Sequence, residues 1–303
     1  MNTLIKQLFI PQQFQHYKRQ SLIDERLGPY NDPDKPAFFF STRSIEKIMT
    51  THKGPAVLIV NNDIRPVENN LEWVKNRKNL YFISTSKLMS TYLDGLGIKY
   101  IEFPFSIAKI SNVNVKPKGK SIYVYGDGPN SNFYGYHIIK RLIKNNFPSL
   151  NIIYAKYGQS MPPFINYTRE ELDKVFDNVF LGIRLINFDG LSATVVDLGM
   201  RGIKTIWNGG TPSALSYSSE RDIINHIKNE YKKVGTSDHL LSQTVFNFLN
   251  PLNSKYDYIY DLSTYSNDLF TPPKLFLNNE SLTFHPYNKW IKERRDMNKP
   301  LSI

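Results

Sequence analysis

The chain has 303 residues, of which 41% are hydrophobic and 14% aromatic, and this composition predicts a globular protein rather than a disordered one. It has no cysteine, which excludes disulfides, thiolate metal sites and cysteine nucleophiles and fits a cytoplasmic location. No apolar run reaches the ~18 residues that a membrane-spanning helix needs. The first residues, MNTLIKQLFIPQQFQ, do not resemble a secretory signal.

The formal net charge of +11 suits three kinds of partner, namely nucleic acid, an anionic membrane surface or a phosphate-bearing substrate. The basic residues are spread along the chain in short clusters, without a run of five like charges and without a zinc-finger or RNP-type motif. We therefore favour a basic surface that attracts a nucleotide diphosphate. Such a surface also allows peripheral contact with anionic surfaces, whereas a nucleic-acid partner is not favoured.

Apolar runs alternate with helical patterns after residue 36, while residues 1–35 follow no clear period. The expected strands are 37–40, 55–60, 80–84 and 98–103, and the expected helices are 44–51, 71–78 and 86–96. Such alternation predicts a parallel sheet with helices on both faces. We assign residues 1–110 to a Rossmann-like N-terminal domain.

A stretch rich in Ser, Asn, Lys and Pro, residues 106–120, is predicted to be an interdomain linker. The alternation then restarts, with expected strands at 121–125, 151–154, 179–186 and 203–207. The expected helices are 136–145, 169–176, one that begins near 191, one capped by Ser218 that ends at 231, and 238–249. We assign 111–250 to a second Rossmann-like domain and 251–303 to an aromatic-rich extension with one expected helix at 288–296.

The central part of the second domain reads VFLGIRLINFDGLSATVVDLGMRG, from residue 179 to 202. A buried strand ends in a turn, a helix follows, and Asp189 and Asp197 frame that helix with seven residues between them. The carboxyl end of such a strand is where open α/β sheets bind ligands. This arrangement resembles the donor-binding domain of GT-B glycosyltransferases, whose retaining members carry an acid-x7-acid pair, usually Glu-x7-Glu, at the same place.

The resemblance implies roles for these residues. Asp189, together with Gly190, Leu191 and Ser192, would lie along the donor sugar, and Asp197 would accept hydrogen bonds from the ribose hydroxyls. The alternative is structural, with Asp189 as the helix N-cap and Asp197 on a solvated helix face.

A second candidate is the loop that begins Gly126-Asp127-Gly128, which follows a strand and precedes a helix. Glycines at this position let the backbone approach a phosphate near a helix N-terminus. The loop departs from the dinucleotide fingerprint, because Ser131 replaces the third glycine and no acid follows before Arg169. An NAD-dependent dehydrogenase is therefore not favoured, and an ordinary β-to-α turn remains open.

The sequence offers four further candidates for contact with a ligand. Arg184, on the strand that leads to Asp189, has a planar fork that suits a diphosphate, although a structural pair with Asp197 is equally open. Asp63 follows a buried strand of the first domain and could be the base of an inverting reaction or orient an acceptor hydroxyl, unless it only forms a turn. The segment Asn208-Gly209-Gly210 could close over a donor or only form a turn, and His137 is expected at the surface.

The sequence thus predicts an α/β protein of two Rossmann-like domains whose parallel sheets face a central cleft, as in GT-B enzymes. The resemblance implies transfer of a sugar from a nucleotide-diphosphate sugar, with a UDP-sugar favoured, to a glycan or other hydroxyl acceptor. It further implies a reaction without cofactor or catalytic metal, and retention is favoured. The alternatives are a basic nucleic-acid-binding protein and another nucleotide-dependent α/β enzyme.

Overall fold

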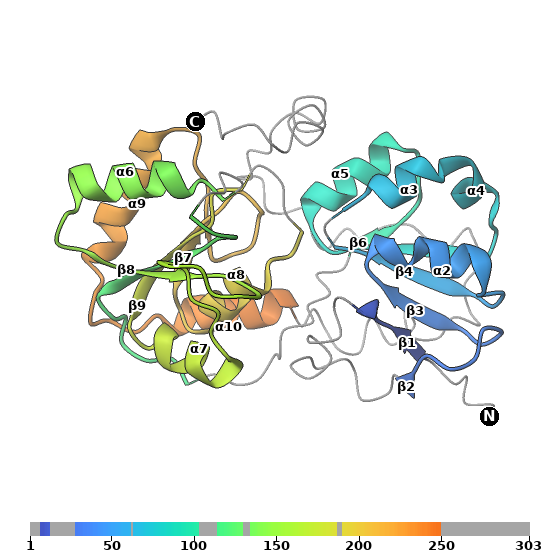
Figure 1. Ribbon diagram of the computed structural model, residues 1–303, viewed down its shortest axis with the longest axis horizontal. Helices are drawn as coiled ribbons and strands as arrows, with labels where there is room; N and C mark the ends of the chain where they lie inside the picture. Colours follow the sequence, from blue (N-terminus) through green and yellow to red (C-terminus); the bar gives the residue numbers. More distant parts are fainter. Residues whose placement is uncertain are drawn as a thin grey trace. The chain divides into compact units, whose positions relative to one another are not determined.

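A computed structural model describes residues 7–12, 28–61, 63–102, 114–129, 134–186 and 190–249 of the chain. The chain divides into two compact units, each built around a parallel sheet (Figure 1). The first unit holds the described residues up to Glu102, and the second holds most of those from Asn114 to Phe246. The expected α/β class with two Rossmann-like domains is confirmed. No helix in the described ranges is long and apolar enough to cross a membrane.

The sheet of the first unit has the strand order β2-β1-β3-β4-β5-β6, and all its pairs are parallel. Its strands are β1 (Gln7–Phe9), β2 (Gly28–Pro29), β3 (Ala37–Phe40), β4 (Ala56–Val60), β5 (Leu80–Ser84) and β6 (Ile101–Glu102). Its helices are α2 (Ile45–Thr50), α3 (Arg65–Asn69), α4 (Leu71–Asn76) and α5 (Lys87–Gly95). Strands β3 and β4 are buried along their whole length, as expected for central parallel strands covered on both faces.

The last described strand of this sheet begins later than the sequence predicts. The strand expected from residue 98 begins at Ile101, because Ile98 closes the preceding helix, and residue 103 lies outside the described residues. Gly97 adopts a left-handed conformation (φ +65°), and the Ile98 N–H donates to the Leu93 carbonyl oxygen at 2.9 Å. This is the hydrogen bond of a Schellman cap, which a glycine at this position favours.

The sheet of the second unit has the strand order β11-β10-β9-β7-β8, again with only parallel pairs. Its strands are β7 (Ser121–Tyr125), β8 (Asn151–Ala155), β9 (Val179–Ile183), β10 (Lys204–Ile206) and β11 (Ala214–Leu215). Its helices are α6 (Tyr136–Asn146), α7 (Arg169–Phe176), α8 (Ala193–Met200), α9 (Glu220–Tyr231) and α10 (His239–Leu249). Numbered along the chain, the strands run 2-1-3-4-5, which is the doubly wound order with its switch point between β7 and β9.

Alternate residues of β7 face opposite layers of the second unit. Ile122 and Val124 belong to a core cluster with residues of α6 and α9, whereas Tyr123 packs with Phe176 of α7 and Leu198 of α8. The two pairs of helices therefore cover opposite faces of the sheet (Figure 1). The helices that follow β7 and β9 lie on opposite faces, and at such a switch point open α/β sheets bind their ligands at the carboxyl ends of the two strands.

The start of α9 and the end of the predicted linker differ from the expectation. The N-cap of α9 is Ser219 rather than Ser218, since Ser219 and Asp222 form a reciprocal capping box. The end of the predicted linker is not a loose segment. The Lys118 ammonium is buried and pairs with Glu230 of α9 at 3.1 Å. The extension 251–303 and its expected helix lie outside the described residues.

Candidate functional site at the switch point of the second sheet

The candidate site lies at the carboxyl ends of β7 and β9, the two neighbouring strands at the switch point. Tyr125 is the last residue of β7, and Arg184 directly follows β9 rather than lying within that strand. The Arg184 N–H donates to the Ile206 carbonyl oxygen at 3.0 Å, which fixes its backbone against β10. Arg184 is only 8% exposed, so its guanidinium is held inside the site.

Two tyrosine rings enclose the Arg184 guanidinium. Its central carbon lies 4.8 Å from the ring centroid of Tyr125 and 4.8 Å from that of Tyr134, the second residue before α6. One of its terminal nitrogens also approaches the Tyr134 hydroxyl at 3.5 Å. The two distances to the ring centroids lie within the range of cation–π attraction. The alternative of a structural pair between Arg184 and Asp197 is not observed, because Asp197 pairs with a different arginine.

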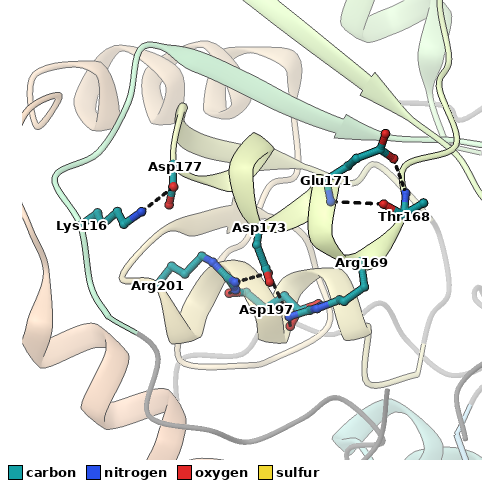
Figure 2. Close-up of polar contacts among 8 residues, drawn as sticks. All are labelled: Lys116, Thr168, Arg169, Glu171, Asp173, Asp177, Asp197 and Arg201. Atoms are coloured by element: carbon teal, nitrogen blue, oxygen red, sulfur yellow. Dashed lines mark hydrogen bonds and ion pairs between the residues drawn. The ribbon is translucent and has the colours of Figure 1, made fainter. Parts of the chain in front are cut away.

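Asp197 belongs to an ion-pair cluster that joins α7 to α8 (Figure 2). Arg169, the first residue of α7, donates to both oxygens of the Asp197 carboxylate, at 2.6 and 3.1 Å. Arg201, which follows α8, donates to the Asp197 carbonyl oxygen at 3.0 Å and to the Asp173 carboxylate at 2.6 Å. Asp197 is 8% exposed, so the expectation of a solvated helix face is wrong.

The cluster changes the proton affinities of its arginines in opposite directions. Burial lowers the pKa of Arg169, but the hydrogen bond and the charge of Asp197 outweigh burial and leave that pKa raised. In Arg201 burial dominates and leaves the pKa lowered. The bidentate fork on Asp197 is the geometry in which arginine binds carboxylates most strongly. These two hydrogen bonds therefore fix the orientation of the Asp197 carboxylate.

Arg184 and Asp197 are both linked to the face of the sheet that α7 and α8 cover. Tyr125, which contacts the Arg184 guanidinium, packs on this face against the cluster that includes Leu198 of α8. Asp197 precedes Leu198 on the same helix and pairs with the first residue of α7. Arg184 directly follows β9, whereas Asp197 lies within the helix after it.

The loop after β7 is held by its neighbours. A Cβ added at Gly126 would lie 2.6 Å from a ring carbon of Phe164, so only glycine fits there without displacement. The Gly126 N–H donates to the Ala155 carbonyl oxygen at 2.9 Å. Gly128 has φ +137°, a conformation that favours glycine, and Asp127 is exposed between the two glycines. The loop therefore runs close to the switch point, next to the start of α6.

The segment before α8 is described only in part. Asp189 lies outside the described residues, whereas Gly190 and Ser192 are buried and Leu191 is half-buried. Ser192 is the N-cap of α8, so the alternative that assigned the N-cap to Asp189 is wrong. The role of Asp189 along a donor sugar stays a prediction.

Asp63 lies at the carboxyl end of β4 in the first unit. Its carboxylate accepts hydrogen bonds from the backbone N–H of Arg65 at 3.1 Å and from the Arg65 guanidinium at 2.7 Å. The bond to the backbone two residues on is that of an Asx turn, the structural alternative that the sequence left open. The Asp63 side chain is 15% exposed and Arg65 is half exposed.

The remaining candidates contribute less. His137 is exposed on the first turn of α6, as expected. The Asn208 side chain binds the backbone N–H and carbonyl oxygen of Tyr217, at 2.9 and 3.0 Å, so it closes a turn. Within the described ranges, no group of three or more His, Asp or Glu side chains could hold a metal ion.

No protein-family model and no curated protein sequence matches this chain. Solved structures do match it. TarM superposes with a TM-score of 0.53 at 10% identity, and the match covers 76% of this chain and 55% of TarM. Sucrose-phosphate synthase from Thermosynechococcus elongatus gives a TM-score of 0.54 at 10% identity, over 84% of this chain and 81% of the synthase.

A third match is the pneumococcal O-GlcNAc transferase GtfA in complex with UDP and GlcNAc, with a TM-score of 0.50 at 10% identity. That match covers 76% of this chain and 57% of GtfA. The chain has the GT-B fold. This chain spans 55% of the length of TarM, so the common part is the GT-B core rather than the whole of that protein.

The sequence alone did not identify three side chains that surround the candidate residues of the second sheet. Tyr125 and Tyr134 enclose Arg184, and Arg169 holds Asp197. Tyr125 could have been found as the last residue of a predicted strand, and Arg169 as the last residue before the first acid that follows Gly128. Tyr134 carries no such mark, because its contact with Arg184 depends on the order of the strands.

Proposed function

We propose that this protein is a glycosyltransferase that moves a sugar from a nucleoside-diphosphate sugar, with a UDP-sugar favoured, to a hydroxyl of a glycan or another acceptor. The observation that carries this proposal is the buried guanidinium of Arg184, held directly after β9 at the switch point of the second sheet in a chain with the GT-B fold. Arginine forks suit diphosphates, and carboxylates suit the hydroxyls of a ribose.

The structural neighbours support the choice of donor. The GtfA structure contains UDP and GlcNAc, and a Staphylococcus aureus TarM variant was solved with UDP, α-GlcNAc-glycerol and fondaparinux. This chain matches that TarM structure with a TM-score of 0.50 at 11% identity. A nucleotide-sugar donor and a glycan or glycerol-type acceptor are therefore the first ligands to test. The absence of cysteine fits a cytoplasmic site of action.

The reaction breaks the bond between the anomeric carbon and a diphosphate oxygen, and that oxygen keeps the electron pair. The acceptor oxygen forms the new bond to the anomeric carbon and loses its proton, which passes to the departing diphosphate in a retaining reaction and to Asp63 in an inverting one. The chain's own part is to bind the growing negative charge on the diphosphate, and fixed cations and dipoles at that position lower the barrier most effectively.

In this proposal Arg184 and the loop Gly126-Asp127-Gly128 hold the phosphates, the loop through its backbone. Asp197 accepts hydrogen bonds from the ribose hydroxyls, with its orientation fixed by Arg169. Asp189, with Gly190, Leu191 and Ser192, lies along the donor sugar.

Retention of the anomeric configuration is our preferred outcome, because the Asp-x7-Asp spacing resembles retaining GT-B enzymes. One structural neighbour, a trehalose-6-phosphate synthase described as transferring with retention, matches with a TM-score of 0.51 at 10% identity. With retention, Asp63 would orient an acceptor hydroxyl; with inversion, it would take the acceptor proton.

The test is a thermal-shift screen with UDP, GDP, dTDP, CMP, NAD, ATP and UDP-sugars in the presence of EDTA. A ligand at about 100 times its Kd stabilises the folded state by about 2.7 kcal/mol, which raises the melting temperature by several degrees. A selective shift with one nucleoside diphosphate supports the proposal and identifies the donor. A shift with NAD or ATP alone, or only salt-sensitive binding to nucleic acid, would contradict it.

A further inference from the structure

The cation at the switch point follows β9 and is not part of the loop that follows β7. The loop Gly126–Gly135 reads GDGPNSNFYG and has no Lys or Arg, and its one charged side chain is the exposed Asp127. Arg184 directly follows the neighbouring strand β9, and its guanidinium contacts Tyr134, a residue of this loop. Electrostatic attraction for an anion at this edge therefore depends on how Arg184 is held.

The two rings that hold Arg184 belong to different parts of the core. Tyr134 packs against the cluster of Ile186, Val195 and Trp207, and Tyr125 packs against the cluster around Tyr123. Their ring centroids are 5.3 Å apart and the rings are inclined by 85°, so they contact the guanidinium from different directions. Each ring is thus fixed by packing that does not involve Arg184.

An arginine side chain that is free in solution loses rotamer entropy when it is held in one geometry. Here the backbone hydrogen bond to Ile206 and the two ring contacts hold the side chain in advance. A site whose charged groups are already in place spends less of its binding energy on ordering them. We propose that Tyr125 and Tyr134 are positioning residues that pre-orient Arg184 for the diphosphate of the donor. This inference rests on the proposed function.

The experiment compares diphosphate with nucleoside binding by titration calorimetry, using UDP, GDP and ADP and the nucleosides uridine, guanosine and adenosine. The variants are Tyr134→Leu and Tyr125→Leu, which remove a ring, and Tyr134→Phe and Tyr125→Phe, which keep it. We expect each Leu variant to weaken diphosphate binding about tenfold (about 1.4 kcal/mol) and to leave nucleoside binding unchanged. Each Phe variant should stay within about twofold of the unmodified protein.

A matched control is Tyr231→Leu. Tyr231 ends α9, is half exposed and packs edge-on against Phe180, the second residue of β9, so it lies at the amino end of that strand. It should leave diphosphate affinity unchanged. Leu variants that bind diphosphates as tightly as the unmodified protein, or that lose diphosphate and nucleoside affinity to the same degree, would overturn the inference. If the unmodified protein binds none of the nucleotides, it is the proposed function that fails.

A second measurement observes the Arg184 guanidinium in the unmodified protein by NMR. In the unmodified protein without ligand, a guanidinium held against two rings should show a ring-current-shifted Nε–H resonance, assigned through Arg184→Lys. The exposed Arg141 on α6 provides the reference in the same spectrum. An Arg184 resonance at the position of Arg141 would show that the guanidinium is not held, and would also overturn the inference.

Discussion

Replacing Asp197 and Arg169 one at a time separates donor binding from the ion pair that joins α7 to α8. If Asp197 accepts two ribose hydrogen bonds, Asp197→Ala removes both. Hydrogen bonds to a charged group contribute about 1.5–3 kcal/mol each. Both carboxylate oxygens already accept a hydrogen bond from Arg169, at 2.6 and 3.1 Å, so each ribose hydrogen bond should lie at the weak end of that range. We therefore expect Asp197→Ala to reduce the binding free energy of UDP by about 3 kcal/mol. This corresponds to an increase of roughly 150-fold in the Kd for UDP.

Arg169→Ala removes the partner and keeps the carboxylate. The Arg169 side chain is 31% exposed and that of Asp197 is 11% exposed, so the pair is neither a surface pair nor a fully buried one. We expect either substitution to lower the free energy of unfolding by about 2 kcal/mol, a value between those typical of exposed and of fully buried ion pairs. Donor affinity should fall less than tenfold in Arg169→Ala, because the carboxylate remains but is less firmly oriented.

The assays are titration calorimetry with UDP and urea unfolding of the same preparations. Asp197→Asn is the matched variant, since it keeps the shape of the side chain and loses its charge. Equal losses of UDP affinity in Asp197→Ala and Arg169→Ala would mean that the ion pair, not a ribose contact, explains both. Unchanged affinity in Asp197→Ala would refute the ribose role directly.

Three further predictions concern stability. Lys118→Met removes one of the two ammonium partners of the buried Glu230 carboxylate and leaves Lys233 at 2.6 Å. Urea unfolding should show a loss of about 1.5–3 kcal/mol, the contribution of a hydrogen bond to a charged group, and no measurable loss would contradict this. Backbone N–H groups at the start of α9 lower the pKa of Asp222 from 3.8 to about 2, so the contribution of Asp222 to the free energy of unfolding is complete above pH 3.8 and is lost as the pH falls toward 2. Asp222→Asn should therefore flatten the fall of the unfolding free energy at acid pH. An unchanged fall would count against the capping box. Gly182→Ala places a Cβ 2.6 Å from Leu198 Cδ1 and should lower the free energy of unfolding by about 1–3 kcal/mol, whereas a neutral result would show that α8 can shift away from β9.

The elements that could be predicted are those whose local sequence carries both a period and an end signal. Helix α7 forms over the predicted residues because Thr168 and Glu171 make a capping box at its start (Figure 2). Strand β4 was predicted because all five of its residues are apolar and buried. Strands β1, β2 and β11 were not predicted, since they have two or three residues and exist only through pairing with distant segments.

The candidate site was likewise predictable only where the local sequence carries the signal. That Arg184 is buried could be predicted from its place beside an apolar strand, but its neighbours could not. The sequence suggested Asp197 as a partner, 13 residues further on, whereas Tyr134 lies 50 residues before Arg184 in the chain. The pairing of β7 with β9 determines which residues meet there, and strand order depends on long-range packing rather than on local pattern.

The distribution of charge supports different roles for the two ends of the site. Asp197 is matched by Arg169 and lies near Arg201, so the negative charge of this carboxylate is balanced within the protein. A balanced carboxylate can still accept hydrogen bonds from neutral hydroxyls, but it repels an incoming anion less than an isolated one would. Tyr125 and Tyr134 contact the Arg184 guanidinium with their rings, and such contacts fix the direction in which a guanidinium points. In the proposed function Arg184 would bind the diphosphate and Asp197 would accept hydrogen bonds from the ribose, so a nucleoside diphosphate would engage both.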